Sequence, residues 1–210
     1  MKILELFSGS QSVSNVFRNH GWETFTVEKD PYFKASTTFN GDVLDITPNC
    51  ILNTFGKPTV IWASPPCTTY SIAAISHHRT REYNGNLIPK SKLAVESDHL
   101  VRHTIYLIQR LRPSYWFIEN PRGGMRKMDF MQMLPRYTVT YCQYGDNRMK
   151  PTDIWTNHPE PQFRACCKNG ALCHVSAPRG ARTGTQGLKD TRERSKIPLE
   201  LCEHIYKIVN

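Results

Sequence analysis

Short apolar runs alternate with segments of helical periodicity along most of the chain. The apolar runs predict strands at 2–7, 24–28, 59–63, 115–120, 137–144 and 153–157. Helical spacing predicts a helix that begins near residue 13 and ends before Gly21, then helices at about 92–112, 126–134 and 197–209. Strands that alternate with helices predict an α/β fold with a mainly parallel sheet covered on both faces.

Residues 158–195 interrupt this alternation. The stretch is rich in Cys, Gly, Pro and Arg and shows almost no apolar periodicity. We therefore expect three parts: an α/β domain at 1–157, a small irregular module at 158–195, and a C-terminal helix at 196–210 that packs back on the domain.

Bulk composition narrows the function classes. The 210 residues carry a formal net charge of +9, which favours a polyanionic partner such as nucleic acid. No apolar run approaches the roughly 20 residues of a membrane helix, and Glu5 interrupts the short apolar stretch at the N-terminus, so we expect neither a membrane span nor a secretory signal. The cysteines number seven, an odd count that favours a reducing cytoplasm, where cysteines are buried, catalytic or metal-bound.

Unusual residues stand at the ends of four predicted strands, in "LFSGS" (6–10), "VEKD" (27–30), "ASPPC" (63–67) and "IENPRGG" (118–124). Ligands bind outside the carboxyl ends of the strands in an open parallel sheet. Gly9 allows a tight turn into a helix whose free N–H groups suit an anionic ligand, and Glu28 suits hydrogen bonds from ribose hydroxyls. The competing interpretations are a generic turn and a solvated carboxylate.

Cys67 and Glu119 are the candidate chemical groups. Two prolines fix the direction of Cys67, and nearby basic residues can lower a thiol pKa and create a thiolate nucleophile. The segment that follows, with Arg79, Arg81 and Lys90, suits a flexible basic flap over a nucleic-acid backbone. Glu119, at the rim of an apolar strand, suits a proton donor. Packing of the cysteine, solvated loop charges and a helix-capping glutamate are the competing interpretations.

In this order, the segments "LFSGS", "VEKD", "GDVLD", "PPCTTYS", "ENPRGG" and "CQYGDNRMK" resemble the cytosine-5 DNA methyltransferases. The resemblance covers about residues 3–157, and its most specific part is the Pro-Cys loop followed by a strand that ends in Glu-Asn. It implies a Rossmann-like, S-adenosylmethionine-dependent methyltransferase fold. It also implies double-stranded DNA as the partner, with the target cytosine flipped out of the helix.

In this family a cysteine thiolate adds to carbon-6 of cytosine while a glutamic acid protonates N3, and carbon-5 then attacks the methyl group. By resemblance, Cys67 is the nucleophile and Glu119 the acid, Asn120 holds the glutamate and the loop, and Lys150 contacts the flipped base or a phosphate. Within the cofactor site, Glu28 would take the ribose hydroxyls and Asp42 the adenine amino group, with Pro65 lining the methyl-donor pocket. The full implied set is Phe7, Ser8, Gly9, Ser10, Glu28, Lys29, Asp42, Val43 and Pro65.

The chain departs from the family pattern at several points. Pro121 stands where the family has valine, and Arg148 and Lys150 stand where it has Gln and Arg. The closing Gly-Asn-Ser motif is absent, and "GTQGLKD" (184–190) is its candidate replacement. The chain is also shorter than most members in the region that reads DNA sequence, which raises the hypothesis of a truncated or partner-dependent enzyme.

The irregular module contains a group of Cys and His residues. His158, Cys167, Cys173 and His174 offer the four N and S ligands of a structural zinc site, with Cys166 as the alternative fourth ligand. A stretch so poor in apolar residues needs such a staple if it is ordered, whereas the unfamiliar spacing leaves a loop with free cysteines as the alternative. The neighbouring basic residues suit phosphate and guanine contacts; they are Arg179, Arg182, Lys189, Arg192, Arg194 and Lys196.

The sequence thus predicts a compact, monomeric DNA cytosine-5 methyltransferase in the cytoplasm of a bacterial or phage-infected cell. Two other hypotheses stay open: an RNA cytosine-5 methyltransferase, and a catalytically inert nucleic-acid-binding protein on the same fold. The presence of both Cys67 and Glu119 argues against the inert protein.

Overall fold

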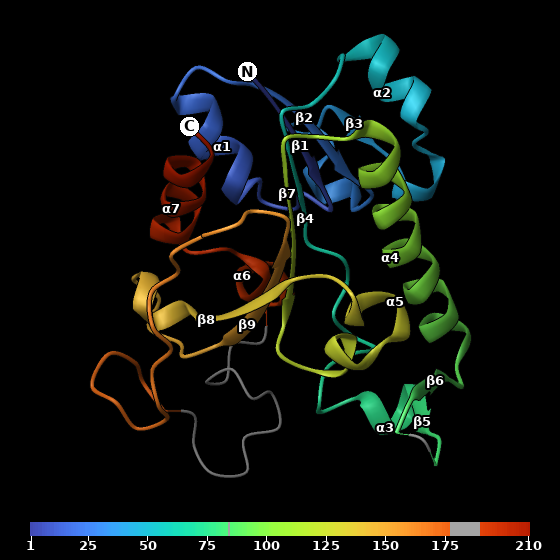
Figure 1. Cartoon of the computed structure of the whole chain (residues 1–210), viewed down its shortest axis with the longest axis vertical. Coiled ribbons are helices and arrows are strands. Elements are labelled where there is room, and N and C mark those ends of the chain that lie inside the picture. The colour runs from blue at the N-terminus through green and yellow to red at the C-terminus, as the bar shows by residue number, and fades with distance from the viewer. Residues whose placement is uncertain (84, 177–189) are drawn as a thin grey trace.

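Among the described residues, a seven-stranded sheet forms the centre of the fold, in the order β3-β2-β1-β4-β7-β9-β8 (Figure 1). The computed structural model describes residues 1–83, 85–176 and 190–210. The strands of this sheet are β1 (Lys2–Leu6), β2 (Glu23–Glu28), β3 (Phe39–Asn40), β4 (Val60–Ala63), β7 (Tyr115–Pro121), β8 (Arg136–Thr140) and β9 (Pro151–Thr156), and β5 (Arg79–Arg81) and β6 (Leu87–Pro89) form a separate hairpin.

The helices connect these strands. The α-helices are α1 (Ser12–Asn19), α2 (Pro48–Thr54), α3 (Ile75–His78), α4 (Lys92–Leu111), α5 (Asp129–Gln132), α6 (Thr191–Ser195) and α7 (Leu199–Val209), and the 3-10 helices are η1 (Pro31–Phe33), η2 (Val43–Asp45), η3 (Gly124–Lys127) and η4 (Tyr141–Tyr144). Ser91 caps the N-terminus of the long helix α4, because its hydroxyl accepts the Ala94 N–H. The helix ends before Pro113, as the sequence predicts.

Five neighbouring strands, β3, β2, β1, β4 and β7, run parallel, and β9 is antiparallel to both β7 and β8. The prediction of an α/β fold with a mainly parallel sheet is confirmed. The strand β4, "VIWA", is buried along its whole length, which is typical of a strand covered on both faces.

Helices cover the two faces of the sheet in separate layers (Figure 1). Val60 and Trp62 pack into the core formed with α1 and α7, whereas Ile61 and Ala63 pack into the core formed with α2 and α4. This alternation follows from the period of two along a strand. Because β2, β1, β4 and β7 run parallel, their carboxyl ends lie at one edge of the sheet. The polar strand-end residues meet at that edge.

Two of the predicted elements differ from the structure. The strand expected at 137–144 ends at Thr140, because η4 turns the chain and Gly145, at φ 85°, closes that turn in the left-handed region. The helical piece expected at 126–134 is two short helices, η3 and α5.

The irregular module is described at residues 158–176, which contain no helix or strand, and at residues 190–195, which contain α6. The terminal helix α7 lies beside α1 (Figure 1). Within the described ranges, no helix combines the length and the apolar character required to cross a bilayer.

Candidate active site

The turn between β1 and α1 is strained. Phe7 (φ 58°) and Gln11 (φ 57°) adopt the left-handed region that non-glycine residues rarely enter, and Gly9 shares it at φ 44°. The Gly9 N–H donates to Glu28 Oε2 at 2.9 Å, so the end of β2 supports the turn after β1. Strain of this kind concentrates at functional sites.

A cavity of about 230 Å³ opens beside this turn. Glu28 and Lys29 line it from the end of β2, and Asp42 and Val43 line it from the start of η2. The Glu28 carboxylate also accepts the Asp30 N–H at 2.8 Å. Each of its two oxygens therefore accepts a backbone N–H, which fixes the orientation of the carboxylate. A cavity between acidic strand-end residues suits a ligand with hydroxyl and amino donors.

A second cavity, of about 480 Å³, continues from the first and shares Phe7, Gly9 and Ser64 with it. Cys67, Glu119 and Lys150 line this larger cavity from the ends of β4 and β7 and the start of β9. The two cavities together contain all of the residues that the resemblance implies for the cofactor: Phe7, Ser8, Gly9, Ser10, Glu28, Lys29, Asp42, Val43 and Pro65.

Asn120 does not line either cavity but connects the two strand ends. Its Nδ2 donates to the Pro65 carbonyl at 2.8 Å, so β7 fixes the loop that carries Cys67. The Cys67 carbonyl in turn accepts the N–H groups of Tyr70 and Ser71, which closes a turn directly after the cysteine. These bonds hold the cysteine at the cavity wall.

Burial raises the pKa of the Cys67 thiol, and the nearby Glu119 carboxyl raises it further. Lys150 and Arg194 act in the opposite direction but do not reverse the shift. The expectation of a lowered thiol pKa is therefore wrong, because the site is more buried than a strand-end loop suggests. The thiol must lose its proton before it can act as a nucleophile.

Glu119 is 5% exposed and accepts a hydrogen bond from the Tyr141 hydroxyl at 2.8 Å. Burial, with the neighbouring Glu119, raises the pKa of Tyr141 well above its usual range, so Tyr141 remains a donor. Lys150 lies over the Tyr141 ring at 4.4 Å and donates to the Arg194 carbonyl at 2.9 Å. Burial lowers the pKa of Lys150, and Glu119 opposes that shift.

Sequence reasoning missed the contribution of α6. Thr191 and Ser195 line both cavities, and Arg192 lines the smaller one, where it pairs with Asp30 at 3.1 Å and lies over the Tyr32 ring. Arg192 is thus engaged in the wall of the smaller cavity, where its guanidinium pairs with Asp30. Of the other expected DNA-contacting residues, Arg194 lines the larger cavity and Lys196 pairs with Glu193 at 2.8 Å. Arg179, Arg182 and Lys189, and all of "GTQGLKD" except Asp190, lie outside the described residues.

The basic residues that follow Cys67 are only partly exposed to solvent. Arg79 is 3% exposed and bonds both carboxylate oxygens of Asp98 on α4, at 2.7 and 3.1 Å, so it is not part of an exposed flap. Its Nε also donates to the Thr69 carbonyl at 3.0 Å. Arg81 and Lys90, on the β5–β6 hairpin and just beyond it, are exposed.

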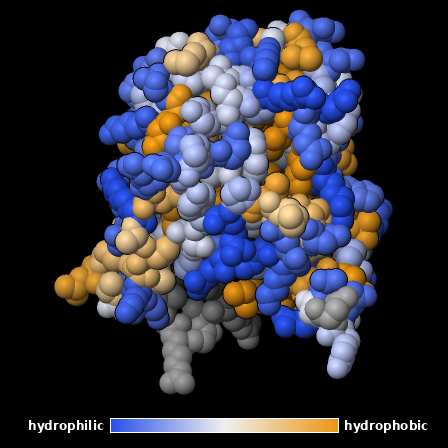
Figure 2. Space-filling view, viewed as in Figure 1, coloured by the Kyte–Doolittle hydropathy of each residue, from blue (hydrophilic) through white to orange (hydrophobic). Residues whose placement is uncertain are grey.

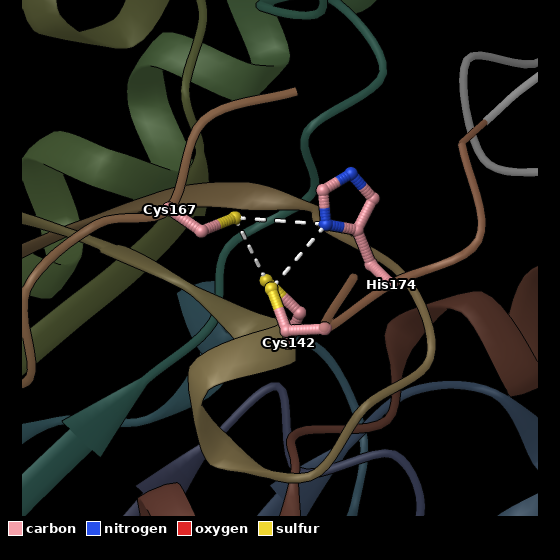
Figure 3. Close-up of side chains that lie close together, drawn as sticks. Cys142, Cys167 and His174 are labelled. Carbon is pink, nitrogen blue, oxygen red and sulfur yellow. Dashed lines mark hydrogen bonds between the residues drawn. The ribbon is translucent and has the colours of Figure 1, made fainter. Parts of the chain in front are cut away.

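Three cysteines and a histidine come together beside η4 (Figure 3). The ligand atoms of Cys142, Cys167, Cys173 and His174 all lie within 4.8 Å of one another, a set that could hold a metal ion. The expected ligand His158 is elsewhere, because its Nε2 bonds the Ile208 carbonyl at 2.8 Å. Cys142 takes its place.

The alternative ligand Cys166 also points away from this set. Its thiol donates to the Thr138 carbonyl at 3.0 Å. Cys142 was missed because its segment reads as a strand.

Comparisons with known proteins agree on one family. The model of the family "C-5 cytosine-specific DNA methylase" matches residues 1–138. The "Probable DNA (cytosine-5)-methyltransferase" of Frog virus 3 (isolate Goorha) is 34% identical over 231 aligned residues, which cover 96% of this chain and 100% of that protein.

Among solved structures, the chain is similar to an E. coli "putative DNA modification methyltransferase encoded within prophage Cp". The TM-score is 0.55 at 18% identity, with 74% of this chain covered. The chain spans 46% of that longer protein.

Proposed function

The chain belongs to the C-5 cytosine-specific DNA methylase family, whose reaction is methyl transfer to carbon-5 of cytosine in DNA, and we propose that Cys67 is its nucleophile and Glu119 its acid. The observation that carries these roles is the larger cavity, where Cys67, Glu119 and Lys150 face the same space. That space continues into the acidic cavity beside Gly9.

The smaller cavity, the adjoining part of the larger cavity and the turn after β1 together fit S-adenosylmethionine. The Ser8 hydroxyl is buried without a hydrogen-bond partner and lines the larger cavity, so it is available to a polar group of a ligand. Glu28 and Asp42 supply acceptors for the ribose hydroxyls and the adenine amino group. When bound, S-adenosylmethionine supplies the electrophilic methyl group.

The reaction begins when Cys67, as the thiolate, adds to carbon-6 of cytosine. This addition removes the C5–C6 double bond and increases electron density on carbon-5 while Glu119 gives its proton to N3. Carbon-5 would then accept the methyl group, with release of S-adenosylhomocysteine. Loss of the carbon-5 proton to water and return of the N3 proton to Glu119 would expel the Cys67 thiolate and restore the ring. The Lys150 ammonium, which lowers the pKa of Cys67, assists formation of the thiolate.

A cytosine stacked in a duplex does not expose carbon-6 to a side chain in a cavity. The target base therefore leaves the helix and enters the larger cavity, at the cost of a few kcal/mol of stacking and pairing.

We place the enzyme in the cytoplasm of a bacterial or phage-infected cell, because its nucleophile requires a reduced thiol. We expect it to act as a monomer.

Trapping on DNA that contains 5-fluorocytosine tests these roles, because fluorine at carbon-5 prevents the proton loss that releases the enzyme. With S-adenosylmethionine, the wild-type protein should form an adduct that survives denaturation, and Cys67→Ser should form none. Cys50→Ser, on α2, is the matched control and should trap as the wild type does.

The same assay includes structured RNA with 5-fluorocytosine. An adduct on RNA alone would overturn the assignment of DNA as substrate. No adduct on either polymer would favour the inert nucleic-acid-binding protein, and an adduct that persists in Cys67→Ser would contradict the assignment of the nucleophile.

A further inference from the structure

We propose that Cys142, Cys167, Cys173 and His174 bind one structural zinc ion that fastens residues 158–176 to η4, next to the catalytic Glu119. Three thiolates and one imidazole are a recurrent structural zinc set, and four protein ligands leave no open position for catalysis. The metal site itself does not depend on the proposed catalytic roles; only its consequence for Glu119 does.

The distances between the ligand atoms fit a tetrahedral ion. Zinc bonds of about 2.3 Å to sulfur and about 2.0 Å to nitrogen give edges of roughly 3.8 Å between sulfurs and roughly 3.5 Å between sulfur and nitrogen. His174 Nδ1 lies 3.7 Å from Cys167 Sγ and 3.5 Å from Cys173 Sγ (Figure 3). The two sulfurs of Cys142 and Cys167, at 3.0 Å, need to separate by less than 1 Å.

Among the described residues, apolar packing and ion pairs fasten residues 158–176 only up to Arg164: Phe163 packs against the core, and Arg164 pairs with Glu200. From residue 165 to residue 176 no residue is buried, and Leu172 and Val175 are fully or mostly exposed. Figure 2 shows hydrophobic residues on a projection at the lower left, where Figure 1 draws this segment. A segment that buries so little apolar surface cannot offset its conformational entropy by packing, and a metal ion can supply that stabilisation.

The four ligands join separate parts of the chain. Cys142 lies in η4, whereas the other three ligands lie in the irregular segment, 25 residues or more further on. Backbone bonds reinforce this junction: the Cys167 N–H donates to Thr140 Oγ1 at 3.0 Å, and the Val175 N–H donates to the Asn147 carbonyl at 2.9 Å. A bound ion would therefore fix η4 as well as the loop.

Fixing η4 has a direct consequence for the larger cavity. Tyr141, adjacent to the ligand Cys142, donates the hydrogen bond that orients Glu119. The Lys150 ammonium also lies over the Tyr141 ring. The zinc ion is thus a positioning device for the acid, acting through one residue of η4, and it does not touch the substrate.

Metal analysis of the purified full chain tests the site without any activity measurement. Elemental analysis should find about one zinc ion per chain in the wild type. Replacement by cobalt should give the intense sulfur-to-metal charge-transfer band and the visible bands of a tetrahedral site with three thiolates. Absence of zinc after purification and after added zinc would overturn the proposal, as would a Cys142–Cys167 disulfide in reduced preparations.

Variants locate the ligands. Cys142→Ser and Cys173→Ser should each reduce bound zinc to roughly a tenth or less. Cys166→Ser is the matched control, because Cys166 neighbours a ligand yet bonds the Thr138 carbonyl; it should keep its zinc. Zinc retained in Cys142→Ser would overturn the ligand set. If a ligand variant fails to fold, the cobalt spectrum of the wild type still decides.

The consequence for catalysis is measured separately. Removal of zinc by a chelator should lower kcat at least tenfold with little change in KM for S-adenosylmethionine, and added zinc should restore it. One zinc ion per chain without this loss would overturn the link to Glu119. An inactive protein that still binds zinc would contradict the proposed function instead.

Discussion

Cys67 combines a nucleophile's position with a thiol pKa that is raised by burial and by Glu119. Alkylation of Cys67 by iodoacetamide should therefore accelerate only at a pH above the usual range of a thiol. Lys150→Met should move that profile to still higher pH, because the ammonium lowers the pKa of Cys67. Peptide mass spectrometry across a pH series measures the rate at this one residue.

The control for this experiment is Lys207→Met, an exposed lysine on α7 whose loss changes the net charge by the same amount. Its profile should match that of the wild type. A Cys67 profile that does not move in Lys150→Met would show that the two side chains do not interact.

Tyr141 is the single hydrogen-bond donor to the Glu119 carboxyl among the described residues. Tyr141→Phe removes the hydroxyl and leaves the ring in place, so the fold should be kept. The loss of this hydrogen bond should raise the activation free energy by about 1 to 2 kcal/mol, which corresponds to a kcat roughly tenfold lower. Steady-state methylation should show this fall in kcat with KM for S-adenosylmethionine unchanged; a rise in KM alone would contradict a role in positioning the acid.

Glu5 is buried in β1 and accepts the Ser14 N–H at 2.8 Å. Burial raises its pKa from 4.5 to about 7. The folded protein thus holds a proton that the unfolded chain releases above pH 4.5, and the free energy of unfolding falls as pH rises toward 7, by about 3 kcal/mol in total. In Glu5→Gln this fall should be absent, as urea unfolding at pH 5, 6, 7 and 8 would show. Parallel curves for the two proteins would contradict it.

At the residue scale, the sequence indicates Cys67 and Glu119 because each stands close to the end of an apolar strand. Cys142 was not predictable, since "YTVTYCQY" has the composition of a strand and its partner Cys167 lies 25 residues away. His158 was expected as a ligand because of sequence proximity, whereas its imidazole bonds the Ile208 carbonyl of α7. Such pairings depend on tertiary packing, which spacing does not encode.

At the element scale, the segment after the nucleophile is fastened to α4 by a buried ion pair. Arg79 bonds Asp98, and the Tyr70 hydroxyl donates to the same carboxylate at 2.7 Å. Asp98→Ala leaves a buried guanidinium without its partner, so the free energy of unfolding should fall by about 3 to 5 kcal/mol. Chemical denaturation monitored by circular dichroism measures this change.

The exposed pair between Arg102 and Asp129, at 3.1 Å, is the matched control. Asp129→Ala should cost about 1 kcal/mol or less, because solvent screens both charges. Equal losses in the two variants would mean that burial does not distinguish the pairs, and that the segment after Cys67 is not fastened through Asp98.

Among the elements, β1, β4 and β7 were predictable because their apolar runs are long and the strands are covered on both faces. The two-residue strand β3 is too short to give a periodic signal. The helix α6, "TRERS", has no apolar face. Its place at the smaller cavity depends on the contact of Arg192 with Asp30, 162 positions earlier, which no local pattern indicates.

At the scale of the whole molecule, the net charge of +9 favours DNA as a partner, and we expect the DNA-facing side to be the edge of the sheet where the cavities open. The parallel strands end on the side of the two cavities, where the β5–β6 hairpin also lies (Figure 1). Lys57 precedes β4 in the sequence, so it stands at the opposite edge of the sheet. Neutralised phosphates release counterions, so the logarithm of DNA affinity should fall linearly with the logarithm of salt concentration.

Arg81 on the hairpin is the exposed cation that tests this geometry. Arg81→Gln should weaken binding on every DNA sequence and reduce the salt slope by about 0.9, the contribution of one phosphate contact. Lys57→Gln makes the same change in net charge on the opposite side and should leave the slope unchanged. Fluorescence anisotropy over a salt series measures both. An equal effect in the two variants would mean that DNA responds to net charge alone, and no effect in Arg81→Gln would exclude the hairpin from the DNA-facing side.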